Sequence, residues 1–258
     1  MSLTTVEREL ASTIGMSVEI CEIVKQQCPG ILSQLSAVTA DYQWQPIAGL
    51  SVAVKRSDVQ PMLAALQPKL IPHGYRAFWS ESRGPDGRRQ SDEIAVARTD
   101  SDTFILDIRR PSGANYGVSA ADVVNKIQDW KERSKCQVIG AATDWVAIDF
   151  ETLPDNACRF AEEVYCFCPD TVEQGVGLMS EEDDPETFAA ARKLCPTLSA
   201  EMQQKIDAQT ARFQQMTLPP QLRQMLDAGM GFSTPTDMGI RLLAYNLQLS
   251  RQLFLWWD

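Results

Sequence analysis

The sequence is very poor in histidine, and this scarcity limits the chemistry that one chain can carry. His73 is the only histidine among 258 residues, which excludes a metal site built from several histidines of a single chain. A catalytic triad or a Cys-His pair would have to use His73 itself. It lies in the segment Ile71-Pro-His-Gly-Tyr75, whose proline and glycine predict a turn. We therefore expect His73 to be an exposed turn residue and not a general base.

Long apolar runs are also missing. No apolar stretch approaches the roughly 18 residues of a membrane-spanning helix. The first residues carry Glu7, Arg8 and Glu9, whereas a signal peptide begins with basic residues followed by an uninterrupted apolar stretch. We expect a cytoplasmic protein that does not associate with membranes.

Basic residues are fewer than acidic ones, 24 against 34, which gives a formal net charge of -10. This balance is unfavourable for binding a nucleic-acid backbone or an anionic membrane surface, so we expect neither as a partner. A basic protein partner, in contrast, would be attracted and steered. Simple solubility explains the same acidic balance without any partner.

The cysteines are odd in number, seven in all. In a protein expected to be cytoplasmic this predicts reduced thiols, most of them buried as small hydrophobic residues. Cys166 and Cys168, with Cys158 nearby, leave open a redox or zinc site. Burial is the favoured interpretation because a zinc site usually needs two closely spaced pairs.

Periodicity and capping signals predict a mixture of helices and strands. Helical segments are expected within residues 4–36, after Ser57, Ser119 and Thr152, within 180–235, and over 236–248. Residues 93–98 and 103–109 are predicted to form a hairpin. The predicted strands cover residues 50–55, 75–80, 93–98, 103–109, 136–140, 145–150 and 253–257.

This order of elements predicts an α+β fold, with a mixed β-sheet packed against helices. We divide the chain into an N-terminal helical extension, residues 1–45, and an α+β domain, residues 46–258. A helical insertion over residues 178–236 interrupts that domain, and helices are expected near 186–194, 199–216 and 220–228.

Several short motifs occur in an order that is more distinctive than any one of them. They are Gly74-Tyr75, Asn115-Tyr-Gly117, Gly140-Ala-Ala-Thr-Asp144, Leu153-Pro-Asp155, Phe160-Ala-Glu-Glu-Val-Tyr165, Phe167-Cys-Pro-Asp170, Gln174-Gly-Val-Gly177 and the terminal Leu255-Trp-Trp-Asp258. Over about residues 46–178 and 236–258 the chain resembles the bacterial family known as domain of unknown function 4253. Members of that family pass directly from the Gln-Gly-Val-Gly motif to the last helix, which is why residues 178–236 are interpreted as an insertion. The resemblance transfers no reaction and no catalytic residue, but it implies a link to toxin and secretion gene clusters.

The carboxylates between residues 144 and 163 are candidates for metal ligands or for an acid/base pair. No metal-binding spacing accompanies them, so helix caps and solvated positions explain them better, and we expect no metal and no cofactor. The set comprises Asp144, Asp149, Glu151, Asp155, Glu162 and Glu163.

Two loop motifs and the end of the chain leave similar choices open. The glycines of Asn115-Tyr-Gly117 and Gln174-Gly-Val-Gly177 fit turns that need a positive φ, yet they also fit a loop beside a ligand. Adjacent residues of a strand point to opposite faces, so one of Trp256 and Trp257 can pack in the core while the other covers a helix or a ligand.

Our leading hypothesis is a non-enzymatic binding protein, specifically an immunity protein that occludes the basic active site of a toxin. The residues expected to bind this partner are Glu181, Glu182, Asp183 and Asp184. The alternative is a small-ligand-binding module or an enzyme. Its pocket would include Asn115, Tyr116, Asp144, Asp170 and Gln174. A structural subunit with a large self-interface is a third possibility.

Overall fold

A computed structural model describes residues 2–83, 89–215 and 234–257 of the protein. Its strands are β1 (Ser33–Val38), β2 (Trp44–Val54), β3 (Tyr75–Arg83), β4 (Arg89–Arg98), β5 (Lys135–Ala141), β6 (Trp145–Thr152) and β7 (Gln252–Trp256). The main helices are α1 (Thr5–Thr13), α2 (Val18–Gln27), α3 (Val59–Leu70), α4 (Phe104–Arg109), α5 (Ala120–Arg133), α6 (Ala157–Phe167), α7 (Pro185–Leu194), α8 (Ala200–Gln215) and α10 (Thr236–Ser250). The predicted helix near 220–228 lies outside the described residues.

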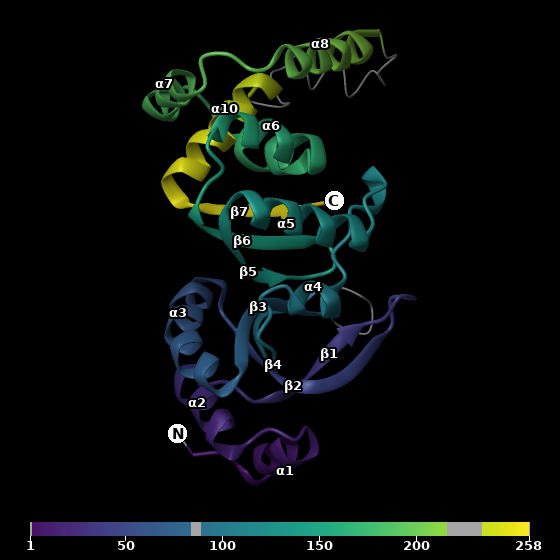
Figure 1. Ribbon diagram of the computed structural model, residues 1–258, viewed down its shortest axis with the longest axis vertical. Helices are drawn as coiled ribbons and strands as arrows, with labels where there is room; N and C mark the ends of the chain where they lie inside the picture. The colour runs from purple at the N-terminus through teal and green to yellow at the C-terminus, as the bar shows by residue number, and fades with distance from the viewer. Residues whose placement is uncertain (1, 84–88, 216–233, 258) are drawn as a thin grey trace. The chain divides into compact units, whose positions relative to one another are not determined.

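One seven-stranded sheet has the strand order β1-β2-β4-β3-β5-β6-β7 (Figure 1). The pairs β1/β2, β2/β4 and β3/β4 are antiparallel, whereas β3 and β5 are parallel. The sheet is therefore mixed, and the predicted α+β class is confirmed. No helix in the described part of the chain has the length and apolar content that crossing a membrane requires.

The chain divides into two compact units. The first comprises residues 1–112, 119–127 and 137–148, and the second comprises residues 113–118, 128–136 and 149–258.

In the first unit, the N-terminal helices begin where their caps predict. Thr4 Oγ1 accepts a hydrogen bond from Glu7 N, and Glu7 Oε2 accepts one from Thr4 N, which together form a capping box. Glu7 also accepts from Lys25 Nζ at 2.6 Å and from Leu32 N at 3.2 Å, and only 3% of Glu7 is exposed. Burial raises the pKa of Glu7, but these hydrogen bonds outweigh it and lower that pKa to about 2.

The core of the first unit forms on β2, β3 and β4. Leu50 on β2 pairs with Val96 on β4, which pairs with Ala77 on β3, and all three are fully buried. Helix α3 buries Leu63 and Leu66 and lies against β3. His73 is exposed in the short helical turn after α3, as predicted.

Three local predictions in the first unit are wrong. The last part of the segment predicted as helical is strand β1, because pairing with β2 overrides the local pattern. Residues 103–109 are not the second strand of a hairpin but contain α4, since a short apolar run does not distinguish a strand from a buried helix. Ser57 lies in a 3-10 turn and does not cap α3.

In the second unit, α6 packs its apolar side among aromatic rings. The Phe160 ring lies edge-on to Trp130 at 5.3 Å and to Phe150 at 5.5 Å, measured between ring centroids. Helix α10 packs against α6 and α7. The cap of α6 is Asn156, which accepts from Arg159 N, and not Thr152, whose hydroxyl accepts from the start of β5.

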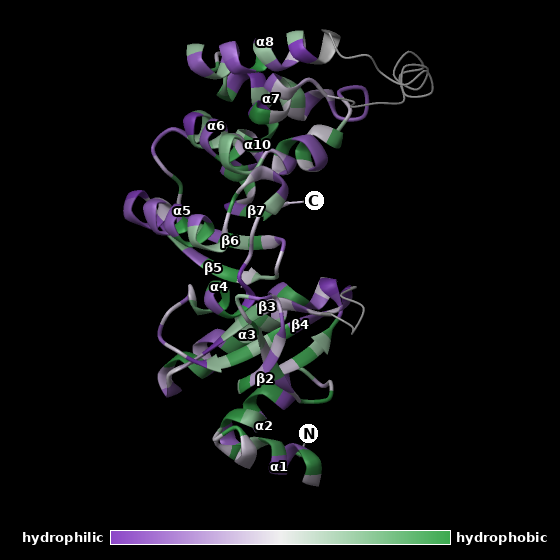
Figure 2. Cartoon of the chain, turned by 90° about the vertical axis from the view of Figure 1, so that its right-hand side faces the viewer, coloured by the Kyte–Doolittle hydropathy of each residue, from purple (hydrophilic) through white to green (hydrophobic). Residues whose placement is uncertain are grey.

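The segment predicted as a helical insertion contains α7 and α8 in its described part. Helix α8 alternates hydrophilic and hydrophobic residues (Figure 2) and buries Met202 and Ile206, as expected of a helix with one packed face.

Cys158 and Cys195 form a disulfide, with Cα atoms 5.7 Å apart. The expectation of reduced thiols is therefore wrong for this pair. The two cysteines are 37 positions apart, so their proximity depends on the packing of α6 with the end of α7 and not on any local spacing. Five cysteines are free, of which Cys166 is exposed and Cys168 buried.

Candidate functional site

A tight loop presents Tyr116 in the second unit. Gly113 and Val118 pair across the loop through reciprocal backbone hydrogen bonds, and Ala114–Tyr116 form a single 3-10 turn. Gly117 follows with a φ of +70°, so the predicted need for glycine is confirmed here. A Cβ atom on Gly113 would lie 2.4 Å from Trp257 Cδ1, which means that the Trp257 indole fixes the base of the loop.

Tyr116 meets two residues that are distant in sequence. Its hydroxyl donates a hydrogen bond to Asp170 Oδ1 at 2.6 Å, and Gln174 Nε2 donates to the same oxygen at 3.0 Å. Asp170 is only 1% exposed. We call Tyr116, Asp170 and Gln174 the Asp170 cluster.

The Tyr116 phenol acts as a hydrogen-bond donor in this cluster. Burial raises the pKa of Tyr116 well above its ordinary value, and the hydrogen bond to Asp170 and the negative charge of that carboxylate raise it further. The phenol therefore stays protonated at neutral pH and holds the carboxylate in place.

A π-helical turn follows Asp170 and covers Thr171–Gly175. Single π-turns are uncommon and occur often at functional sites. Two side chains fix this turn against the outer edge of β7: Cys168 Sγ donates to Trp256 O at 2.9 Å and Thr171 Oγ1 donates to Phe254 O at 3.3 Å. Cys168 therefore serves as a buried donor to a strand carbonyl, as the burial interpretation favoured.

Close packing explains the second loop motif better than turn geometry does. Neither Gly175 nor Gly177 has a positive φ, so that prediction is wrong for this motif. A Cβ atom on Gly177 would lie 2.5 Å from Val172 O, whereas the same atom on Gly175 would meet nothing nearer than 3.7 Å. Glycine at 177 allows two turns of backbone to touch.

Asp170 borders a cavity of about 390 Å³, which we call the Asp170 cavity. Its walls come from the π-helical turn and the residues after it, the second half of α10, and β7. Asp170 is the only charged residue among the lining residues that the structure describes. The lining residues are Asp170, Thr171, Gly175, Val176, Met179, Leu243, Asn246, Ser250, Gln252, Leu253, Phe254 and Trp256.

The two terminal tryptophans have different surroundings. Trp257 is 3% exposed and lies edge-on to Phe167, with ring centroids 5.7 Å apart. Trp256 is half-buried and lines the cavity. One tryptophan therefore packs in the core while the other faces the space where a ligand would lie.

Three of the five residues predicted for the alternative pocket thus come together: Tyr116, Asp170 and Gln174. Asn115 is exposed in the loop beside Tyr116. Asp144 lies in the first unit, between β5 and β6, and we leave it out of the cluster. Sequence reasoning missed the walls that α10 contributes, because no local signal links residues so far apart in the chain.

The acidic segment 181–184 is not a uniform charged surface. The Glu181 carboxylate forms two hydrogen bonds of 2.6 Å with the Arg192 guanidinium, which lower the pKa of Glu181. Asp184 caps α7 by accepting from Thr187 N at 3.1 Å. Glu182 and Asp183 are exposed.

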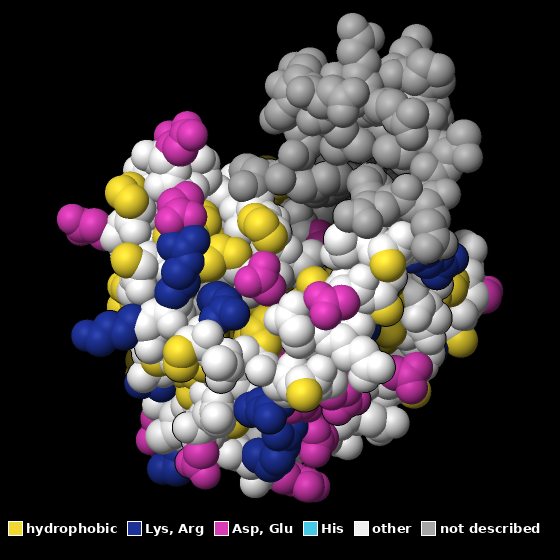
Figure 3. All heavy atoms as spheres, turned by 90° about the horizontal axis from the view of Figure 1, so that it is seen from above, with side chains coloured by type: hydrophobic (Ala, Val, Ile, Leu, Met, Phe, Trp, Pro, Cys, Tyr) yellow, Lys and Arg dark blue, Asp and Glu magenta, His cyan; other side chains and the backbone are white. Residues whose placement is uncertain are grey.

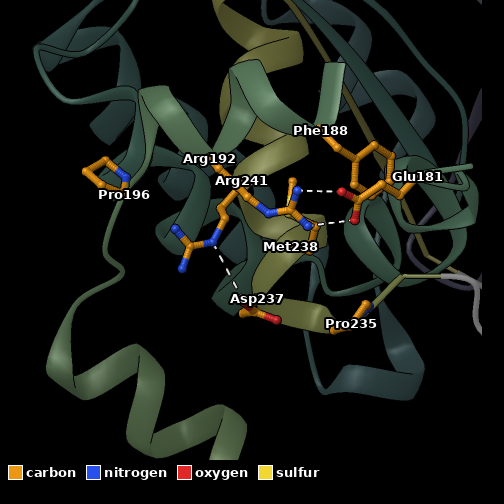
Figure 4. A pocket seen from close by; sticks show the side chains of 8 residues that line it. All are labelled: Glu181, Phe188, Arg192, Pro196, Pro235, Asp237, Met238 and Arg241. Atoms are coloured by element: carbon orange, nitrogen blue, oxygen red, sulfur yellow. Dashed lines mark hydrogen bonds and ion pairs between the residues drawn. The ribbon is translucent and has the colours of Figure 1, made fainter. Parts of the chain in front are cut away.

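Glu181 also belongs to a second cavity, of about 360 Å³. Figure 4 shows its carboxylate turned toward Arg192, with Asp237 and Arg241 paired beside them. Acidic and basic side chains are interspersed on the face that Figure 3 shows. The other lining residues are Phe188, Pro196, Pro235 and Met238.

The three glutamates of the carboxylate set between residues 144 and 163 have structural contacts. Glu162 accepts from the backbone N and the hydroxyl of Ser199, and Glu163 accepts from Trp130 Nε1 at 2.9 Å. Glu151 pairs with Lys135. Within the described ranges, no group of three or more His, Cys, Asp or Glu residues is placed to hold a metal ion.

A family model for a domain of unknown function, DUF4253, matches residues 93–258, which is more than half of the chain. The chain belongs to the DUF4253 family. The match includes all of the Asp170 cluster and every residue of the Asp170 cavity. No curated protein and no solved structure matches the chain.

Proposed function

We propose that the second unit is a small-ligand-binding module and that its ligand occupies the Asp170 cavity. The observation that carries this proposal is the buried Asp170 carboxylate, held at the cavity wall by the distant Tyr116 and the nearby Gln174. Burying a charged group is costly unless hydrogen bonds compensate it. If this part of the core had no function, apolar side chains would fill it at a lower free-energy cost than a buried carboxylate.

The cavity has the size and character of a ligand site. Small-molecule pockets have volumes of roughly 300 to 1,000 Å³ and apolar walls with a few oriented polar groups. The Asp170 cavity combines apolar walls with one carboxylate and a rim of Asn246, Ser250 and Gln252. The Asp170 cluster contains no activated nucleophile, so the proposal is binding and not catalysis.

A cavity-filling variant tests the proposal. Asn246 is exposed on α10 and lines the cavity, so Asn246→Trp should fill it without disturbing the core. Gln248 is exposed on the same helix but outside the lining, which makes Gln248→Trp the matched control. A panel of small amines, alcohols, acids and sugars would be screened by thermal shift and confirmed by calorimetry.

The expected result is a compound that binds the wild type and Gln248→Trp but not Asn246→Trp. At 100 times its Kd such a compound stabilises the folded state by about 2.7 kcal/mol. A panel in which nothing binds, or in which binders do not distinguish the two variants, would contradict the proposal.

The second candidate is an immunity protein that occludes the basic active site of a toxin. It is favoured by the net charge of -10 and by the exposed pair Glu182 and Asp183. Because Glu181 and Asp184 have internal partners, that exposed pair is the part of the segment best able to meet a basic surface.

The test begins with a pull-down from native cells at low and high salt, followed by reconstitution with the purified partner. The double variant Glu182→Lys/Asp183→Lys should lower the association rate several-fold at low salt. Glu9→Lys/Glu19→Lys, two exposed reversals on α1 and α2, controls for the net charge. An unchanged association rate, or an equal loss in the control, would argue against an interface at this segment.

A further inference from the structure

We propose that the Asp170 cavity selects ligands in which a cationic amine is joined to an apolar body. This inference rests on the proposed small-ligand function and adds the chemical class of the ligand. The charge of the lining carries the first step. Within the described part of the chain, Asp170 is the only charged residue of the lining, and none of the lining residues there is a lysine, arginine or histidine. A ligand anion would meet a negative wall with no cation to pair with, whereas an ammonium group would be attracted.

The surroundings of Asp170 strengthen this preference. Glu173 lies on the π-helical turn that follows Asp170 and accepts a hydrogen bond from Tyr165 at 2.9 Å. A second carboxylate three positions after Asp170 makes the local potential more negative. A cation that enters the cavity is therefore favoured over a neutral molecule of the same shape.

The rim offers acceptors that suit an ammonium group. Asn246, Ser250 and Gln252 carry amide or hydroxyl oxygens at the cavity lining, and an ammonium group has three donors to satisfy. Together with the carboxylate they provide a polar end for the ligand. The preference would be strongest for a primary amine, which keeps all three donors.

The opposite walls suit an apolar body. Val176, Met179 and Leu243 present aliphatic and thioether surface, and Phe254 and Trp256 present aromatic rings. Phe254 is 37% exposed, so part of its ring is accessible at the cavity. Aromatic faces also attract cations, so the walls and the carboxylate favour the same kind of ligand.

Three probes with the same ring test the class: 2-phenylethylamine, 2-phenylethanol and phenylacetate. They place a cation, a neutral hydroxyl and an anion on one apolar body. Calorimetry on the full chain at neutral pH should show the amine binding at least about tenfold more tightly than the alcohol, which is about 1.4 kcal/mol. Phenylacetate should show no measurable binding.

Two variants assign the preference to the cavity. Asp170→Asn should reduce the preference for the amine over the alcohol to less than about threefold, with circular dichroism checking the fold. Because Asp170 is buried, a second variant avoids dependence on its folding. Gln252 is exposed at the rim, and Gln252→Lys should weaken amine binding several-fold and allow phenylacetate to bind.

The outcomes separate this inference from the function on which it rests. If the alcohol or phenylacetate binds as tightly as the amine and Asn246→Trp abolishes both, the cavity binds ligands but the proposed class is wrong. If the amine preference survives both charge variants, Asp170 does not set it and the inference is overturned. If no probe binds, or if all bind Asn246→Trp unchanged, this inference is overturned, and the panel of small amines, alcohols, acids and sugars then decides whether the small-ligand function fails too.

Discussion

Replacing the buried Arg109 should destabilise the protein more than any change to an exposed charge. Arg109 ends α4 and is 1% exposed. Its guanidinium donates to Ser80 Oγ at 2.6 Å, to the carbonyl of Ser36 and to Glu93 Oε1. Glu93 is itself 6% exposed, and burial raises its pKa although the Arg109 charge acts in the opposite direction. The two charges therefore depend on each other in the interior of the first unit.

Arg109→Met removes the cation and leaves the Glu93 carboxylate buried and uncompensated. Breaking a buried ion pair in this way costs about 3 to 5 kcal/mol. Replacing both charges removes the uncompensated carboxylate, so Arg109→Met/Glu93→Met should be at least about 1 kcal/mol more stable than Arg109→Met alone. The free energy of unfolding would be measured by urea denaturation.

An exposed ion pair provides the control for this experiment. Lys135 and Glu151 are both more than 70% exposed, so Lys135→Met should change stability by less than about 1 kcal/mol. The reasoning is refuted if Arg109→Met is no more harmful than Lys135→Met. It is also refuted if the double variant loses as much free energy of unfolding as Arg109→Met and Glu93→Met lose when their separate effects are added. A single variant that does not fold, beside a double variant that does, supports it.

Three further predictions concern local contacts. The folded pKa of Glu7 is about 2 and its ordinary value is 4.5, so Glu7 stabilises the fold fully above pH 4.5 and loses this effect as the pH falls toward 2. In urea denaturation the free energy of unfolding of the wild type should exceed that of Glu7→Gln by about 1 to 3 kcal/mol. This difference should shrink as the pH falls from 4.5 toward 2, and a constant difference would contradict the assignment. Gly177→Ala should cost about 1 to 3 kcal/mol and Gly175→Ala much less, and equal costs would exclude the close approach as the cause. Peptide mapping without reductant should find Cys158 linked to Cys195, and Cys158→Ser should lose about 2 to 4 kcal/mol only under oxidising conditions. Free thiols at both positions would refute the disulfide.

Local signals in the sequence predict the elements whose stability depends on neighbouring residues. The Thr4 capping box and the reciprocal hydrogen bonds of Ser119 and Asp122 start α1 and α5 as expected. The strands predicted over 75–80 and 145–150 are present as parts of β3 and β6. For the two helices the signal and the interaction lie within a few residues of each other.

Long-range contacts decide the elements that the sequence could not predict. Strand β1 exists because β2 pairs with it. The apolar run that contains Ile105 and Leu106 fits a buried helix as well as a strand. The disulfide joins positions 158 and 195, and the cavity combines a turn after α6 with α10. The motifs point to Tyr116, Asp170 and Gln174, but only the packed structure shows that Tyr116 and Gln174 both donate hydrogen bonds to Asp170.

The Asp170 cavity and the cavity beside Glu181 take their linings from different parts of the chain, and this bears on the two proposed functions. The lining of the Asp170 cavity comes from residues 170–179 and 243–256, so only Met179 lies within 178–236. The cavity beside Glu181 takes five of its eight lining residues from 178–236: Glu181, Phe188, Arg192, Pro196 and Pro235. A protein that lacked residues 178–236 would keep nearly all of the first lining and lose most of the second. The proposed ligand site therefore depends little on residues 178–236, whereas the proposed role of the acidic segment depends on them.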